Sequence, residues 1–94
     1  MDDLDLSIQR RIDDDPGYRE MLEAEVRRQR LIGRLVEQRK ANQLTQAAVA
    51  RVMHVSQPVV AEIESAKADV RVSTLERYAS AVSGHRVHLE LVPD

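Results

Sequence analysis

The chain has 94 residues, the size of one small domain, and its 43% hydrophobic and 32% charged residues are compatible with a folded core. It contains no Cys, which excludes a disulfide scaffold and thiolate chemistry, and no Phe or Trp on which single-stranded nucleic acids could stack. No apolar run approaches the roughly 20 residues of a membrane span, and the acidic start is unlike a signal peptide. We therefore expect a cytoplasmic protein with no membrane partner.

The net charge of −2 conceals an uneven distribution. Residues 1–25 carry nine acidic and three basic side chains, whereas residues 26–94 carry eleven basic and seven acidic ones. Such an asymmetry indicates partners of different kinds for the two parts of the chain. The basic part is compatible with a nucleic acid, and the acidic part with a basic protein.

The first segment, residues 1–17, is predicted to be an acidic arm. Apolar residues recur at every fourth position from Leu4 to Ile12, which favours a short amphipathic helix. A run of three Asp residues before Pro16 equally favours a solvated, disordered tail, because like charges in sequence repel each other. Both alternatives stay open.

Residues 18–84 are expected to form an all-α domain. Its first element is a long helix over residues 18 to about 41, in which apolar side chains recur at helical spacing. Its last element is a short helix that begins after an N-cap at Ser73 or Thr74. That helix is expected to end at Gly84, since glycine readily takes the left-handed conformation of a C-cap.

The middle of the domain, residues 45–65, has the pattern of a helix-turn-helix. Thr45 is a suitable N-cap for a helix over residues 46–53. After a three-residue turn, Ser56 is a suitable N-cap for a second helix over residues 57–65. In this motif the second helix enters the major groove of double-stranded DNA, so the sequence predicts a sequence-specific DNA-binding protein.

The last ten residues, 85–94, differ from the rest. Polar and apolar residues alternate from His85 to Val92, which predicts one half-buried β-strand. A single strand leaves its backbone groups unpaired, so its simplest partner is the same strand of a second copy, related by a two-fold axis. The expected dimerisation residues are Val87, Leu89 and Leu91.

The stretch from Leu44 to Glu64, LTQAAVARVMHVSQPVVAEIE, resembles the Cro/Xre-type helix-turn-helix of phage repressors. The resemblance extends over roughly residues 31–84 and implies the five-helix domain of that family. The chain departs from the family at His54 and Ala66, where glycine is common because the backbone tends to need a positive φ.

The resemblance also implies roles for individual side chains. The exposed side of the second helix would read bases, where the amide of Gln57 is suited to the N6/N7 edge of adenine. The implied base-reading residues are Ser56, Gln57, Pro58, Ala61 and Glu62. The implied phosphate contacts are Gln46, Ser65, Lys67 and Arg71. Arg39 and Glu64 match the positions of a partly buried structural ion pair.

Small antitoxins of the HigA and HipB type combine such a domain with a C-terminal strand, and this chain is similar to the HigA type. That similarity implies a homodimer on a palindromic operator, a basic RelE- or HigB-like toxin as partner, and repression of the shared operon. Two alternatives stay open, namely a stand-alone Xre-type regulator of phage or host genes, and a protein-interaction adaptor that has lost DNA binding.

The sequence gives little support for catalysis or metal binding. On a strand, His85 and His88 lie on opposite faces, so we expect no metal site there. His54, Ser56 and Asp69 do not have the spacing of a catalytic triad, and the chain has no glycine-rich phosphate loop. We therefore expect a protein that is not an enzyme and that has no cofactor.

Overall fold

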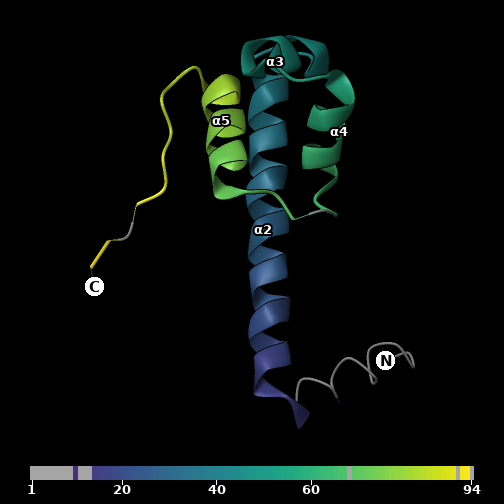
Figure 1. The fold of residues 1–94 in the computed structure, drawn as a ribbon, viewed down its shortest axis with the longest axis vertical. Coiled ribbons are helices and arrows are strands. Elements are labelled where there is room, and N and C mark those ends of the chain that lie inside the picture. Colours follow the sequence, from purple (N-terminus) through teal and green to yellow (C-terminus); the bar gives the residue numbers. More distant parts are fainter. Residues whose placement is uncertain (1–9, 11–13, 68, 91, 94) are drawn as a thin grey trace. The chain divides into compact units, whose positions relative to one another are not determined.

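The computed structural model describes residues 10, 14–67, 69–90 and 92–93 (Figure 1). These residues hold four helices and no strand, which confirms an all-α protein, and the predicted fifth helix is not among them. The helices are α2 (Pro16–Ala41), α3 (Gln46–Met53), α4 (Gln57–Ser65) and α5 (Val72–Ser83). None of them has both the length and the apolar character needed to span a bilayer. The chain divides into two compact units, residues 1–30 and 31–94.

Helix α2 begins at Pro16, two residues before the expected start. A carboxylate oxygen of Asp15 accepts hydrogen bonds from the backbone N–H groups of Gly17 (3.0 Å) and Tyr18 (3.3 Å). The aspartate therefore caps the helix, and Pro16 lies in the first turn, where its missing N–H leaves no bond unmade. The Leu4 to Ile12 pattern expected in the arm lies mostly outside the described residues.

Both helices of the predicted helix-turn-helix form with the expected bounds. The Thr45 hydroxyl accepts a hydrogen bond from the N–H of Ala48 at 3.0 Å and so caps α3. Ser56 occupies the N-cap position of α4, but its side chain makes no capping hydrogen bond. Helix α5 has its N-cap at Arg71, so the expected caps at Ser73 and Thr74 are wrong and these residues lie inside the helix.

The core of the unit formed by residues 31–94 lies where α3, α4 and α5 meet. Small Ala50 is buried, and Val60 and Ile63 of α4 face inward as their spacing of three predicts. Tyr78 is the largest fully buried side chain, in a core that contains no other aromatic ring. The buried cluster consists of Val49, Ala50, Met53, Val60, Ile63, Tyr78 and Val82.

The segment after α5 forms no strand in its described part, so that prediction is not met within the single chain. The N–H of Val87 donates instead to the hydroxyl of Ser80 (2.8 Å), and the N–H of Leu89 donates to the carboxylate of Glu76 (2.5 Å). Side chains of α5 act as acceptors because the rest of the described chain offers no strand for the backbone to pair with. The predicted dimerisation residue Leu91 lies outside the described residues.

Among the described residues, three other than glycine have left-handed backbone conformations, and two of them flank α4. His54, in the turn between α3 and α4, has φ 58°, and Ala66, the C-cap of α4, also has φ 58°. The resemblance to the Cro/Xre-type motif implied a positive φ at both positions. Because a Cβ atom is crowded in this conformation, each position destabilises the fold by about 1–2 kcal/mol relative to an unstrained backbone.

Replacing Ala66 with Gly is expected to stabilise the protein by about 0.5–1 kcal/mol, because relief of the Cβ clash exceeds the extra flexibility of glycine in the unfolded chain. The measurement is the free energy of unfolding in urea. The matched control is Ala61→Gly within α4, which should destabilise by about 1 kcal/mol. A loss of stability in both variants would contradict the strain at Ala66.

Candidate nucleic-acid interface

The turn between α3 and α4 fixes where the second helix of the motif begins. His54 is the C-cap of α3, and its backbone N–H bonds to the carbonyl groups of Ala50 and Arg51. The N–H of Val55 also reaches the Ala50 carbonyl, at 3.0 Å. These bonds close the last turn of α3 and direct the chain into α4 (Figure 1). Pro58 lies in the first turn of α4.

The structure separates the two sides of α4 as the sequence predicts. Val60 and Ile63 are buried in the core, whereas all five predicted base-reading residues are exposed. The unused hydroxyl of Ser56 at the N-cap adds a polar group to the same end of the helix. The exposed residues are Ser56, Gln57, Pro58, Ala61 and Glu62.

The predicted phosphate contacts fall into two kinds. Lys67 and Arg71 are exposed on the loop between α4 and α5. The hydroxyl of Ser65 instead donates to the carbonyl of Glu62 at 2.7 Å, within the last turn of α4. The amide of Gln46 donates to the carboxylate of Glu64 at 3.0 Å. Ser65 therefore already uses its donor inside the protein, and Gln46 uses one of its two amide N–H groups.

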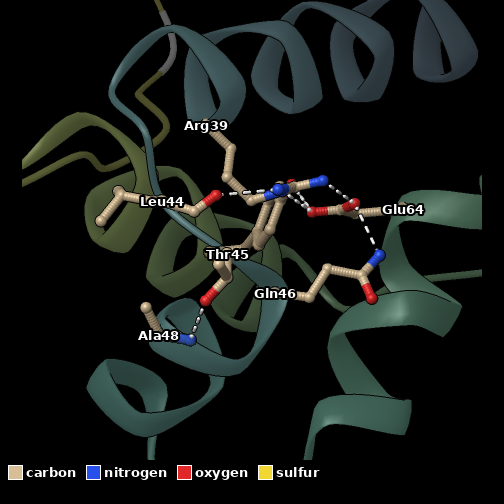
Figure 2. Close-up of polar contacts among 7 residues, drawn as sticks. Arg39, Leu44, Thr45, Gln46, Ala48 and Glu64 are labelled. Carbon is tan, nitrogen blue, oxygen red and sulfur yellow. Dashed lines mark hydrogen bonds and ion pairs between the residues drawn. The ribbon is translucent and has the colours of Figure 1, made fainter.

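Arg39 and Glu64 form an ion pair that joins α2 to α4 (Figure 2). The guanidinium Nε lies 2.7 Å from one carboxylate oxygen and Nη2 lies 3.0 Å from the other, so the contact is bidentate. Nη1 donates to the carbonyl of Leu44 at 2.8 Å. The two side chains are only 11% and 7% exposed, so this charge pair is largely shielded from water.

Two further donors converge on the same carboxylate. The hydroxyl of Tyr78, on α5, donates to Glu64 at 2.6 Å, and the amide of Gln46, at the start of α3, donates at 3.0 Å. Glu64 thus binds side chains from three other helices. We call Arg39, Gln46, Glu64 and Tyr78 the Glu64 cluster. The role of Tyr78 was not predicted from the sequence, although a lone tyrosine at a core position of α5 requires a hydrogen-bond partner.

The contacts in the Glu64 cluster favour the ionised forms of Glu64 and Arg39 and the neutral form of Tyr78. Burial alone would raise the pKa of the Glu64 carboxyl, but hydrogen bonds from Arg39, Tyr78 and Gln46 outweigh burial and lower the pKa below its ordinary value of 4.5. The hydrogen bond to Glu64 raises the pKa of Arg39. Burial, together with the bond to the carboxylate, raises the pKa of Tyr78. At neutral pH the cluster therefore holds one carboxylate, one guanidinium and one neutral phenol.

Comparisons with known proteins agree with this geometry. Residues 35–82 match the protein family described as Helix-turn-helix. Two curated relatives, both called Antitoxin HigA1 and both from Mycobacterium tuberculosis (strains CDC 1551 / Oshkosh and ATCC 25618 / H37Rv), are each 40% identical over 91 residues. The match covers 96% of this chain but 61% of each relative, so the chain spans less than two thirds of their length. No solved structure matches.

Replacing Arg39 with Met is expected to destabilise the protein by about 3–5 kcal/mol, because Glu64 would remain buried without its counter-charge. The measurement is the free energy of unfolding in urea. The matched control is Arg34→Met on the exposed side of α2, which should change stability by less than about 0.5 kcal/mol. The double variant Arg39→Met/Glu64→Gln should be more stable than Arg39→Met alone, and an equal or larger loss would refute the charge pair.

Acidification should remove the stability that Glu64 contributes. A carboxyl with a lower pKa in the folded state stabilises the fold above its unfolded pKa, near 4.5, and this contribution is lost as pH falls through the lower folded value. The free energy of unfolding should therefore fall more steeply below pH 4.5 in the wild type than in Glu64→Gln. Parallel curves for the two proteins would contradict the shift.

Proposed function

Because the chain belongs to the Helix-turn-helix family, we propose that it binds double-stranded DNA by placing α4 in the major groove. The observation that carries this proposal is the exposed side of α4, a helix that the Glu64 cluster holds against three others. Recognition of a DNA sequence requires such rigidity, because side chains distinguish one base from another only when they are held at hydrogen-bond distances from the base edges.

The exposed residues of α4 differ in what they offer to bases. The amide of Gln57 can donate to and accept from the N7 and N6 positions of adenine, and the carboxylate of Glu62 can accept from the N4 amino group of cytosine. Pro58 and Ala61 offer apolar contact suited to the methyl group of thymine. Ser56 contributes a hydroxyl that no capping bond uses. We assign specificity first to Gln57, the longest neutral polar side chain of this set.

Phosphate contacts position the protein on the duplex. The exposed charges of Lys67 and Arg71 flank α4 in sequence and are suited to the DNA backbone. Ser65 is a weaker candidate because its hydroxyl already donates to a carbonyl inside the protein. Gln46 donates one amide N–H to Glu64, and its second N–H would be the one that donates to a phosphate.

We further propose that the chain acts as a HigA-type antitoxin, which neutralises a basic RelE- or HigB-like toxin and represses the shared operon in the cytoplasm. The relatives called Antitoxin HigA1 align with 96% of the chain at 40% identity. The nine acidic side chains within residues 1–25 would attract a basic protein. On α2, Met21 and Val26 are 54% and 45% exposed, which adds apolar surface beside these charges.

The proposed regulator is a homodimer on a palindromic operator. A single helix-turn-helix contacts one half-site, so two-fold dimers bind two half-sites about one helical turn apart, roughly 34 Å. Residues 85–94 are the proposed dimerisation segment, with Val87 and Leu89 in its described part. The extended run of polar and apolar residues beside α5 supports this assignment (Figure 1).

Replacing Gln57 with Ala is expected to weaken binding to a DNA sequence selected by the wild-type protein by about 1–3 kcal/mol and to relax preference at one base pair. The measurements are fluorescence anisotropy titration and reselection from a random pool. The matched control is Gln29→Ala, an exposed glutamine on α2, which should change neither. Unchanged affinity and preference in Gln57→Ala would refute this assignment of the base-reading side.

The antitoxin role predicts that a small basic protein encoded beside this chain arrests growth when produced alone, and that co-production of the chain restores growth. The two proteins should co-purify. The Gln57→Ala variant is the control, since it should still restore growth while it represses the operon poorly. A neighbouring product that does not bind the chain would leave the stand-alone regulator as the function.

A further inference from the structure

The segment from His85 to Glu90 contacts α5 along one edge only. Its N–H groups at Val87 and Leu89 donate to Ser80 and Glu76, two acceptors that lie one helical turn apart on α5. Bonds made by every second residue to one neighbour are the pattern of an extended chain. The backbone groups of the intervening residues therefore point away from α5.

The side chains of the segment alternate in the same way. Val87 and Leu89 line a hollow of about 270 Å³ whose walls include Leu31, Leu35 and Leu75. Arg86 and His88 line a different, larger hollow that adjoins α3, together with His85 and Val87. Leu89 thus lies only at the first hollow and Arg86 and His88 only at the second, while Val87 borders both. The segment therefore has a more apolar and a more polar side, as a half-buried strand has.

The outward edge, formed by the backbones of Arg86, His88 and Glu90, offers unpaired backbone groups like those of a strand edge, although these residues form no regular strand in the single chain. Within the described chain, no backbone hydrogen bond joins it to another element. A strand edge of this kind is a template for pairing with another strand. Along this edge, basic Arg86 is followed by His88 and then by acidic Glu90. Nε2 of His88 lies 3.9 Å from a carboxylate oxygen of Glu90.

We propose that this edge pairs antiparallel with the same edge of a second copy, with His88 on the two-fold axis. The proposal rests on the homodimer of the proposed function and specifies its register. Arg86 then lies opposite Glu90 of the partner subunit, and Glu90 lies opposite the partner's Arg86. Val87 lies opposite the partner's Leu89, and the two imidazoles of His88 face each other.

Charge selects this register over its neighbours. An axis at Val87 would set Arg86 opposite the partner's His88, and an axis at Leu89 would set Arg86 opposite the partner's Val92. An axis at Arg86 or at Glu90 would set like charges against each other, which destabilises a cross-strand pair. Only the axis at His88 gives both full charges of the edge an opposite partner.

The same register covers apolar surface that the single chain leaves open. Leu89 is 57% exposed, at the rim of the hollow that Leu31, Leu35 and Leu75 line. Directly opposed residues of an antiparallel pair share a face, so Val87 and Leu89 of the partner subunit would extend the apolar side of the segment. A second copy therefore fits both the charges and the apolar face of this segment.

A cysteine scan tests the register, and the natural chain is a clean background because it contains no Cys. Val87→Cys, His88→Cys and Leu89→Cys are oxidised separately, and the disulfide-linked dimer is quantified on a denaturing gel. Directly opposed Cα atoms lie about 4.5–5.5 Å apart, within the range of a disulfide, whereas positions displaced by two residues lie beyond about 7 Å. We expect His88→Cys to cross-link at least about fivefold faster than the other two. Fastest linkage at 87 or 89 would overturn the register.

Charge reversal tests the same pairing without a covalent bond. Arg86→Glu and Glu90→Arg should each raise the dimer dissociation constant in sedimentation by about threefold or more, and the double reversal should restore it. The flanking groups Glu76, Arg77 and His85 stay unchanged in all three variants. Two single variants that dimerise like the wild type would overturn the pairing. DNA binding that persists in such a case would leave the proposed function intact, since Gln57→Ala tests that separately.

Discussion

The position of α4 depends on the hydrogen bonds made to the carboxylate of Glu64. This carboxylate accepts hydrogen bonds from Arg39 of α2, Gln46 of α3 and Tyr78 of α5, while it belongs to α4 itself. A small core of Val, Ala, Met and one tyrosine can repack, because such side chains are not directional. The hydrogen bonds are directional, and they therefore fix how α4 lies against its neighbours.

This arrangement leaves the outer side of α4 free. The helix buries Val60 and Ile63, and its last residues are held through Glu64, so its N-terminal turn needs no other support. The turns on either side adopt left-handed backbones without glycine, at His54 and Ala66. The protein tolerates this strain because the buried core and the Glu64 cluster determine where both turns must lie.

The two ends of the chain are proposed to make contacts of different kinds. Acidic side chains are concentrated in residues 1–25, while basic Arg86 and acidic Glu90 lie on the proposed pairing edge after α5. Charge concentrated in one segment attracts any basic surface, whereas an edge that alternates basic and acidic positions is specific for a strand of matching register. The proposed toxin contact and the proposed dimer contact therefore need not compete.

The sequence by itself determined the helices of the motif and the inward side of α4, because cap residues, spacing and turn length act within a few neighbouring positions. The left-handed turns were expected from the resemblance to the Cro/Xre-type motif. The sequence placed the start of α2 two residues late, since the side chain of Asp15 caps that helix. It placed the cap of α5 two or three residues late, since that helix begins after Arg71 without a side-chain capping bond. Only the tertiary structure decided that Tyr78 and Gln46 share Glu64 and that Val87 and Leu89 bind α5. Such contacts join residues from different elements, whose approach depends on packing and not on local pattern.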